Sequence, residues 1–236
     1  MSIAWESAAR KTSGARVTWK VACGIVAALV AATLAAIFFV APEESTMGPV
    51  QRIVYLHVAV AWCGLCGCIL MGIAGVVYLS RRESRWDRAA QSAGEIGWLC
   101  SSLTLATGSL WAHAAWGAWW TWDPRLTTTL VLWTLYAGYF LVRGSVDDAR
   151  RRARISAVLA VLATADVPLV IFATRWFRGI HPVTPEMDPR MRMVLLASIA
   201  GFSSLFALLG AARFHQLKLR DQLAERELDF PHETPE

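Results

Sequence analysis

Charged residues are scarce in this chain. Asp, Glu, Lys and Arg make up only 17% of the 236 residues, whereas 56% are hydrophobic, and the mean hydropathy is +0.41. A soluble domain could not bury this much apolar surface, so the composition predicts a protein of the lipid bilayer. The net charge of +5 comes from short basic clusters. Such clusters are typical of a membrane topology signal, and they argue against a nucleic-acid partner.

Long polar stretches are missing as well. Apolar runs of about 20 residues recur along the sequence, and a run of that length crosses about 30 Å of hydrocarbon. We therefore predict an all-α membrane protein with six transmembrane helices in a single integral membrane domain, residues 1–236, with short outer loops and a charged cytoplasmic tail, residues 213–236. The predicted spans lie near residues 21–41, 53–79, 93–113, 126–142, 155–174 and 193–212.

Basic residues are distributed unequally between the two sides of these spans. Seventeen of the 23 Lys and Arg residues precede the first span, follow the sixth, or lie in the second and fourth connections. By the positive-inside rule both termini are then cytoplasmic. Three connections then face outward: residues 42–52, residues 175–192, and the connection that carries the tryptophan segment described next.

Tryptophan is concentrated in one outer connection. Five of the 12 tryptophans fall within residues 111–126, the tryptophan segment, and positions 116, 119, 120 and 123 would share one face of a helix. Such a cluster is suited to stack on a large planar ligand, while the adjacent Asp and Arg fix its polar edge. The alternative is an interfacial aromatic belt. The segment reads Trp111-Ala-His-Ala-Ala-Trp116-Gly117-Ala-Trp119-Trp120-Thr-Trp122-Asp123-Pro124-Arg125-Leu126.

Two of the five histidines are expected at the same outer interface. His57 lies about one turn inside the second predicted span, and His181 lies in the third outer connection. Either alone could be a hydrogen-bonded interfacial residue, but imidazole is the usual axial ligand of haem iron, and two imidazoles saturate it. Beside the tryptophans this favours a haem site. We expect His113 to be a loop residue without a ligand role, and we assign no role to His215 and His232.

The cysteines and the acidic residues of the predicted spans carry weaker signals. The run Cys63-Gly-Leu-Cys66-Gly-Cys68 suggests a metal site, but it lies in the middle of a helix, where Cys usually packs as a small apolar residue. No Cys-x-x-Cys-His motif for covalent haem occurs. Asp166 lies deepest and should face a cavity or a neighbouring helix, in a structural hydrogen bond or a proton path. Glu95 is expected to reach water at the cytoplasmic boundary.

The stretch from Trp116 to Thr127 resembles the tryptophan-rich "WWD" signature of the membrane haem-handling proteins of cytochrome c maturation. Within that superfamily, the length, the six predicted spans and one outer histidine on each side of the signature make the chain most similar to the haem exporter protein C family. The similarity covers essentially the whole chain.

This resemblance implies a protein of the bacterial inner membrane that binds haem b transiently and non-covalently at the outer face. It implies transfer to a periplasmic haem chaperone, in a complex with ABC-type ATPase and permease subunits and a small membrane subunit. Because the chain has no nucleotide loop and no nucleophile–base pair, we expect no enzyme activity and assign ATP hydrolysis to a partner. The implied axial ligands are His57 and His181. The expected haem-binding residues are Trp111, Trp116, Gly117, Trp119, Trp120, Trp122, Asp123 and Arg125, with Arg52, Arg175 and Arg178 as further candidates for binding the propionates.

Three other functions remain open at this point. A haem lyase or synthase subunit that attaches haem to apocytochrome c shares the signature, although such relatives are expected to be longer, with more spans and histidines. A b-type electron carrier would place pairs of histidines deep in its helices. A transporter with an aromatic gate would need intramembrane charge, for which Asp166 is the one indication.

Overall fold

The computed structural model describes residues 2–181 and 187–229, and their regular secondary structure is entirely helical. This agrees with the all-α prediction. The long helices are α1 (Ser2–Ala35), α2 (Ile53–Arg81), α3 (Ser84–Trp116), α4 (Pro124–Ser145), α5 (Ala149–Thr164), α6 (Asp166–Trp176) and α7 (Pro189–Asp229). Two short helical turns flank the first connection: the π-helix η1 (Ala36–Val40) and the 3-10 helix η2 (Pro49–Arg52).

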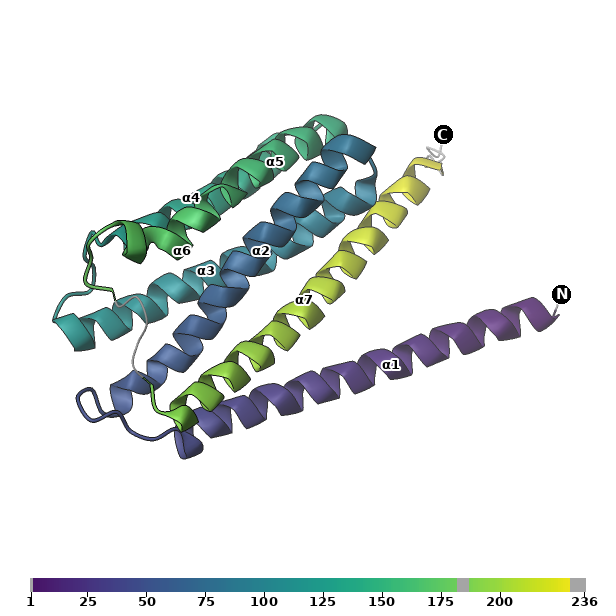
Figure 1. Cartoon of the computed structure of the whole chain (residues 1–236). Helices are drawn as coiled ribbons and strands as arrows, with labels where there is room; N and C mark the ends of the chain where they lie inside the picture. Colours follow the sequence, from purple (N-terminus) through teal and green to yellow (C-terminus); the bar gives the residue numbers. More distant parts are fainter. Residues whose placement is uncertain (1, 182–186, 230–236) are drawn as a thin grey trace, which may run out of the picture.

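The chain runs back and forth along a bundle of helices. The ends of α3 and α6 and the starts of α2, α4 and α7 lie at one end of the molecule, which we call the loop end, whereas α1 begins and α7 finishes at the other (Figure 1). Helix α1 packs mainly against α7 and diverges from the rest of the bundle (Figure 1). All three connections that we predicted to face outward therefore begin and end on the same side of the molecule.

Four helical stretches are long and apolar enough to cross a membrane: Val17–Val40, Pro49–Arg81, Ala149–Trp176 and Pro189–Glu227. They coincide with the first, second, fifth and sixth predicted spans, so the structure describes a multi-pass membrane protein. The other two predicted spans lie within α3 and α4, which are 33 and 22 residues long. These two helices are less apolar along their length, because they carry the hydroxyl and charged side chains that face one another inside the bundle.

We had expected the fifth predicted span to be one continuous helix, but it is not. It breaks between α5, which ends at Thr164, and α6, which begins at Asp166. Pro168 explains the break, since it lacks an N–H and its ring would collide with the carbonyl of Thr164 in a regular helix. The side chain of Asp166 is only 6% exposed at this break, and its Oδ2 atom has no hydrogen-bond partner among the described residues.

Small residues allow α2 and α3 to approach closely. A Cβ atom added to Gly67 would lie 2.6 Å from the Cα atom of Gly97, so side chains larger than hydrogen would separate the two helices. The hydroxyl of Tyr136 on α4 fills the space beside this contact and donates to the carbonyl of Gly64 at 2.8 Å. Cys68 belongs to the same buried core.

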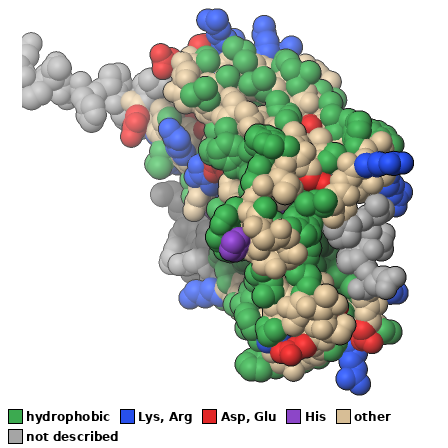
Figure 2. All heavy atoms as spheres, turned by 90° about the vertical axis from the view of Figure 1, so that its left-hand side faces the viewer, with side chains coloured by type: hydrophobic (Ala, Val, Ile, Leu, Met, Phe, Trp, Pro, Cys, Tyr) green, Lys and Arg blue, Asp and Glu red, His purple; other side chains and the backbone are tan. Residues whose placement is uncertain are grey.

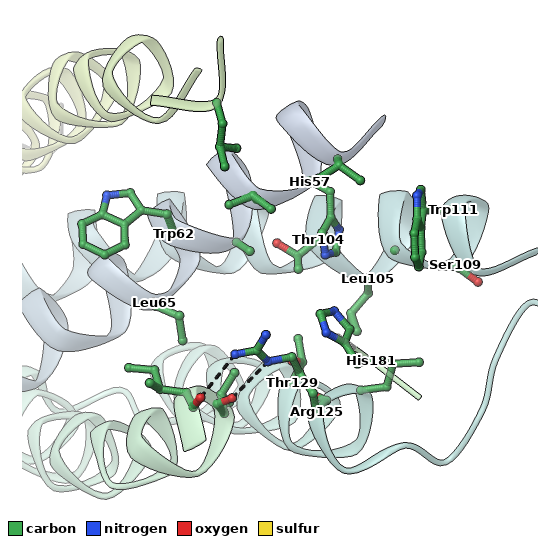
Figure 3. A pocket seen from close by; sticks show the side chains of 18 of the residues that line it. His57, Trp62, Leu65, Thr104, Leu105, Ser109, Trp111, Arg125, Thr129 and His181 are labelled. Atoms are coloured by element: carbon green, nitrogen blue, oxygen red, sulfur yellow. Dashed lines mark hydrogen bonds between the residues drawn. The ribbon is translucent and has the colours of Figure 1, made fainter. Parts of the chain in front are cut away.

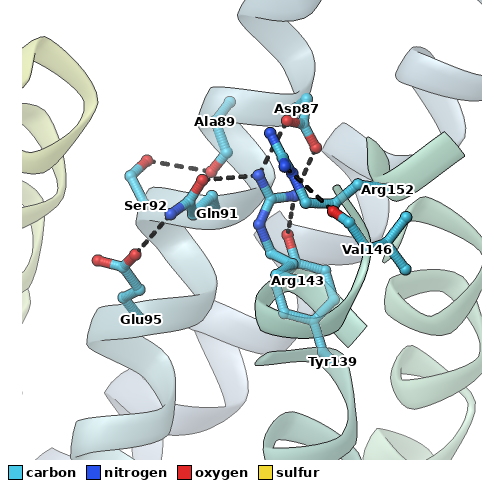
Figure 4. Close-up of polar contacts among 9 residues, drawn as sticks. All are labelled: Asp87, Ala89, Gln91, Ser92, Glu95, Tyr139, Arg143, Val146 and Arg152. Atoms are coloured by element: carbon cyan, nitrogen blue, oxygen red, sulfur yellow. Dashed lines mark hydrogen bonds and ion pairs between the residues drawn. The ribbon is translucent and has the colours of Figure 1, made fainter. Parts of the chain in front are cut away.

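A network of charged side chains ties α3, α4 and α7 together near the end opposite the loop end. Arg143 donates to both carboxylate oxygens of Asp87, at 2.6 and 3.0 Å, and to Gln91 at 2.7 Å (Figure 4). Gln91 in turn donates to Glu95 at 2.8 Å. Glu95 also accepts from Arg213 of α7 at 2.5 and 3.0 Å. Our expectation that Glu95 simply reaches water was therefore wrong, because an arginine from a distant helix pairs with it.

Candidate functional site

A cavity of about 380 Å³ lies between α2, α3, α4, α6 and the first turns of α7 (Figure 3). This size is within the range of small-molecule and cofactor sites. Its walls are predominantly apolar, with a few imidazole, hydroxyl and guanidinium groups. The predicted site residues that line it are His57, Trp111, Trp116, Trp120, Arg125 and His181.

His57 points into the cavity from the second turn of α2 (Figure 3). Its Nδ1 atom lies 3.1 Å from the hydroxyl oxygen of Thr107 on α3. That hydroxyl also lies 2.7 Å from the carbonyl of Leu103, to which it can donate its hydrogen. With the hydroxyl so directed, it accepts from an imidazole that carries its proton on Nδ1, and the lone pair on Nε2 is then available to a metal.

A glycine leaves room for this imidazole. A Cβ atom on Gly108 would lie 2.9 Å from Cε1 of His57, a distance that real Cβ contacts do not show. Thr107 and Gly108 therefore act together on the ring: one orients it and the other leaves space for it. Sequence reasoning missed both, since nothing in the sequence indicates that α3 faces His57 at this point.

His181 reaches the same cavity from the connection after α6 (Figure 3). Its backbone N–H donates to Oδ2 of Asp123 at 3.3 Å, and the N–H of Ile180 donates to the same atom at 2.8 Å. A Cβ atom on Gly179 would lie 2.1 Å from this carboxylate oxygen, so glycine is what allows the loop to approach. The imidazole and the indole of Trp116 meet edge to face, with centroids 6.5 Å apart.

Asp123 is buried, and its second carboxylate oxygen caps the N-terminus of α4. Oδ1 accepts the backbone N–H of Arg125 at 2.9 Å, which makes Asp123 the N-cap, with Pro124 as the first helical residue. We had predicted Asp123 to bind haem directly, but it is absent from the cavity lining. Its carboxylate instead holds together two segments that lie next to the cavity.

The tryptophan segment is not a continuous helix. Helix α3 ends at Trp116, because Gly117 adopts φ +70° and forms the left-handed cap that commonly terminates helices. The prediction that positions 116, 119, 120 and 123 share a helical face was therefore wrong. Trp120 still lines the cavity, but Trp119 and Trp122 are absent from its lining and are 55% and 75% exposed.

The two exposed indoles each contact another aromatic ring. Trp119 stacks on His113 with ring centroids 4.0 Å apart, and His113 itself belongs to α3 and not to a loop. Trp122 packs edge to face against Trp120 at 5.8 Å. Viewed from the loop end, hydrophobic side chains cover much of the surface, and charged side chains lie mainly toward its margin (Figure 2).

Of the four arginines that we predicted near the ligand, only Arg125 lines the cavity. Its Nε and Nη2 atoms donate to the carbonyls of Val170 and Ile171 on α6, at 3.4 and 3.2 Å (Figure 3). Arg52 lies 3.5 Å from the carboxylate of Glu43. The other two candidates, Arg175 and Arg178, are exposed at and beyond the end of α6.

Several further lining residues escaped sequence reasoning. Gln51 accepts a hydrogen bond from the indole N–H of Trp111 at 3.4 Å and so fixes the position of that ring. Trp62 and Leu65 of α2 extend the apolar wall beyond His57, and Ile171 of α6 also contributes to the lining. These are ordinary apolar residues of predicted spans, and only their position in space sets them apart.

Comparison with known proteins identifies the family. Residues 2–229 match the protein family described as "Heme exporter protein C". Curated relatives of that name include those of Bradyrhizobium diazoefficiens (32% identity, covering 79% of this chain and 72% of the relative) and Rhodobacter capsulatus (30%, covering 91% and 95%). The relative from Escherichia coli K12 is 33% identical, with 77% and 76% covered.

Proposed function

Because this chain belongs to the Heme exporter protein C family, we propose that it binds haem at the outer face of the bacterial inner membrane and hands it to a periplasmic haem chaperone for c-type cytochrome maturation. In this role the chain is a haem-delivery subunit and haem is its cargo. The family resemblance and the names of its relatives support delivery over catalysis. The match over nearly the whole length of the Rhodobacter protein favours this family over the longer haem lyases.

One observation carries the proposal: His57 and His181, from distant parts of the sequence, line one cavity together with three indoles of the tryptophan segment and a guanidinium. Imidazole nitrogen is the ligand type that iron in a haem takes most often. We assign the axial positions to Nε2 of His57 and to the imidazole of His181. Trp111, Trp116 and Trp120 provide aromatic surface for the porphyrin.

The geometry also supports a role for Arg125 with the propionates. Its guanidinium is at the cavity wall, where its hydrogen bonds go to neutral carbonyls, and Arg pairs more strongly with a carboxylate than with a carbonyl. The bound haem b is held without a covalent bond, since the residues proposed to hold it act by coordination, stacking and ion pairing. Such a hold can be released when the receiving chaperone approaches the loop end.

We further propose six transmembrane spans with both termini in the cytoplasm. Two features support this topology: the basic residues cluster on one predicted side, and the start of α1 and the end of α7 both lie on the side away from the loop end (Figure 1). A phosphatase reporter fused after Trp122 should be active, and one fused after Arg82 inactive. The opposite pattern would reverse the topology.

The proposed partners follow from what this chain would need. Haem that is held by two imidazoles and several aromatic rings leaves slowly, so an energy source favours release. We propose that ABC-type ATPase and permease subunits supply it, and that a small membrane subunit completes the complex. The test is to assemble the partner subunits without this chain. If that complex still hydrolyses ATP and still retains haem, this chain is not the haem-holding subunit and the proposed division of labour is wrong.

The test of haem binding is the absorbance spectrum of the purified protein. We expect a low-spin, bis-imidazole haem spectrum in the wild type, and loss of haem or a change of spin state in both His57→Ala and His181→Ala. His113→Ala is a matched control, because this exposed imidazole contacts Trp119 outside the cavity. Unchanged spectra in both histidine variants would reject the ligand assignment.

A further inference from the structure

The cavity is longer than the site between the two histidines. On α2 its lining continues from His57 through Trp62 to Leu65, eight residues or about 12 Å farther along the helix. Leu65 lies well inside the membrane-crossing stretch Pro49–Arg81. This inner part of the cavity therefore reaches the depth of the hydrocarbon, whereas the histidines lie near the loop end.

The walls of the inner part are partly open to the outside of the bundle. Trp62 on α2 and Ile171 on α6 both line the cavity, yet they are 49% and 43% exposed. Leu195 of α7 also lines the cavity and is half-buried. Helix α6 packs chiefly against α4, while α7 packs chiefly against α1, α2 and α3, so these two helices do not close the opening between them.

The position of this opening favours lipid over water as its surroundings. Trp62 and Ile171 belong to two of the candidate membrane spans, and the side chains around the opening are apolar. A charged or strongly hydrated ligand would lose its water on this route with nothing to replace it. A flat macrocycle that is already dissolved in the bilayer keeps its apolar ring in hydrocarbon on this route, and only its propionates need a polar partner.

We propose that haem enters this cavity sideways from the bilayer, through a portal formed by Trp62, Ile171 and Leu195, and then moves outward to the histidines. This proposal rests on the proposed haem-binding function and adds the route by which the cargo arrives. Arg125 lies between the portal and the histidine end, bonded to the carbonyl of the portal residue Ile171. A propionate that follows the ring inward would meet this guanidinium first.

Trp62 is the movable part of the portal in this scheme. Its indole is large and half exposed and has lipid on one side, so a change of rotamer can widen the opening without moving a helix. Ile171 and Leu195 are smaller side chains on α6 and α7. Enlarging either of them should therefore narrow the portal, and shortening Trp62 should widen it.

The test measures how fast haemin loads the apo-protein reconstituted in phosphatidylcholine vesicles, followed by the Soret band. Ile171→Trp and Leu195→Trp should each slow loading by about tenfold, which corresponds to about 1.4 kcal/mol of barrier, with an unchanged final amplitude. Trp62→Ala should load faster than the wild type. The matched controls are Leu169→Trp and Leu196→Trp, which add the same bulk at exposed positions outside the cavity lining and should load normally.

Two outcomes would overturn the portal. Loading at the wild-type rate in both Ile171→Trp and Leu195→Trp would show that haemin arrives by another route, such as the aqueous loop end. A lower final amplitude at a normal rate would place these residues in the binding site and not at its entrance. Neither outcome touches haem binding itself, which fails only if the wild-type protein takes up no haemin with a bis-imidazole spectrum.

Discussion

The carboxylate of Asp123 holds the backbone of His181 in place. Its Oδ2 atom accepts the N–H groups of Ile180 and His181 at 2.8 and 3.3 Å, while Oδ1 caps α4 through the N–H of Arg125. Asp123 and His181 are separated by 58 positions in the sequence. One buried side chain thus connects the tryptophan segment to the loop that carries the second histidine, and we expect it to act as a positioning residue.

The first prediction follows from this contact. In Asp123→Ala the loop loses its anchor, so His181 should be poorly placed and haem affinity should fall by about 10- to 100-fold, the usual cost of removing a group that orients a metal ligand. A haemin titration of the purified protein measures this, and the spectrum should shift toward high spin as His181 is lost.

Asp148→Ala is the matched control for this variant. Asp148 caps α5 by accepting the N–H of Arg151 at 2.6 Å, but it lies outside the cavity lining. Both substitutions should lower stability by about 1 kcal/mol through loss of an N-cap, yet only Asp123→Ala should weaken haem binding. Equal affinities in the two variants would mean that Asp123 is only a helix cap.

The second prediction divides the tryptophans. Trp120 lines the cavity, whereas Trp122 is 75% exposed beside it. Trp120→Ala should therefore lower the haem content of the purified protein several-fold, because stacking surface is lost at the ligand. Trp122→Ala removes the same side chain next to the cavity and should leave haem content normal. If both variants lost haem equally, the distinction between Trp120 and Trp122 would be wrong, and the tryptophan segment would act as one unit.

Much of this fold follows from the sequence, because apolar runs and helix-end signals are local. The second predicted span begins at residue 53, where α2 begins, and Pro124 occupies the first turn of α4, where a proline is tolerated. Two boundaries were misjudged although their signals were present. Gly117 indicated the end of α3, and Pro168 indicated the break between α5 and α6, but the surrounding apolar residues hid both.

The candidate site was less predictable, because its decisive contacts join residues that are far apart in the sequence. The histidines and tryptophans stand out as residue types, so they could be named in advance. The hydrogen bond from His57 to Thr107 and the tether from Asp123 to His181 could not, since Thr and Asp are common at these positions for local reasons. Sequence pattern identifies the ligand chemistry, and packing decides which members of a cluster face the ligand.

The third prediction concerns the space beside His57. Because a Cβ atom on Gly108 would lie 2.9 Å from this imidazole, Gly108→Ala should displace the ring from its position on Thr107. We expect weaker iron ligation and a changed Soret maximum in a protein that still folds. Gly138→Ala is the control, since nothing lies within 4 Å of a Cβ atom at that position of α4. A normal spectrum in Gly108→Ala would show that the imidazole can shift without cost.

The last prediction concerns the charged network at the other end of the molecule. The side chains of Arg143 and Asp87 are only 10% and 20% exposed and form two hydrogen bonds (Figure 4). Arg143→Ala leaves the carboxylate buried without its counter-ion, which costs about 3–5 kcal/mol in comparable buried pairs. The thermal midpoint in detergent should fall accordingly. In Arg85→Ala, which removes an exposed surface pair with Glu83, the loss should be at most about 1 kcal/mol.

A double variant separates charge from packing in this network. If the cost arises from the unpaired carboxylate, Arg143→Ala combined with Asp87→Asn should be more stable than Arg143→Ala alone, because the buried charge is gone. If the double variant is no more stable, the loss comes from the contacts of the long arginine side chain with Tyr139 and Gln91. In either case the molecules that remain folded should bind haem normally, since the network lies at the end opposite the cavity and shares no residue with its lining.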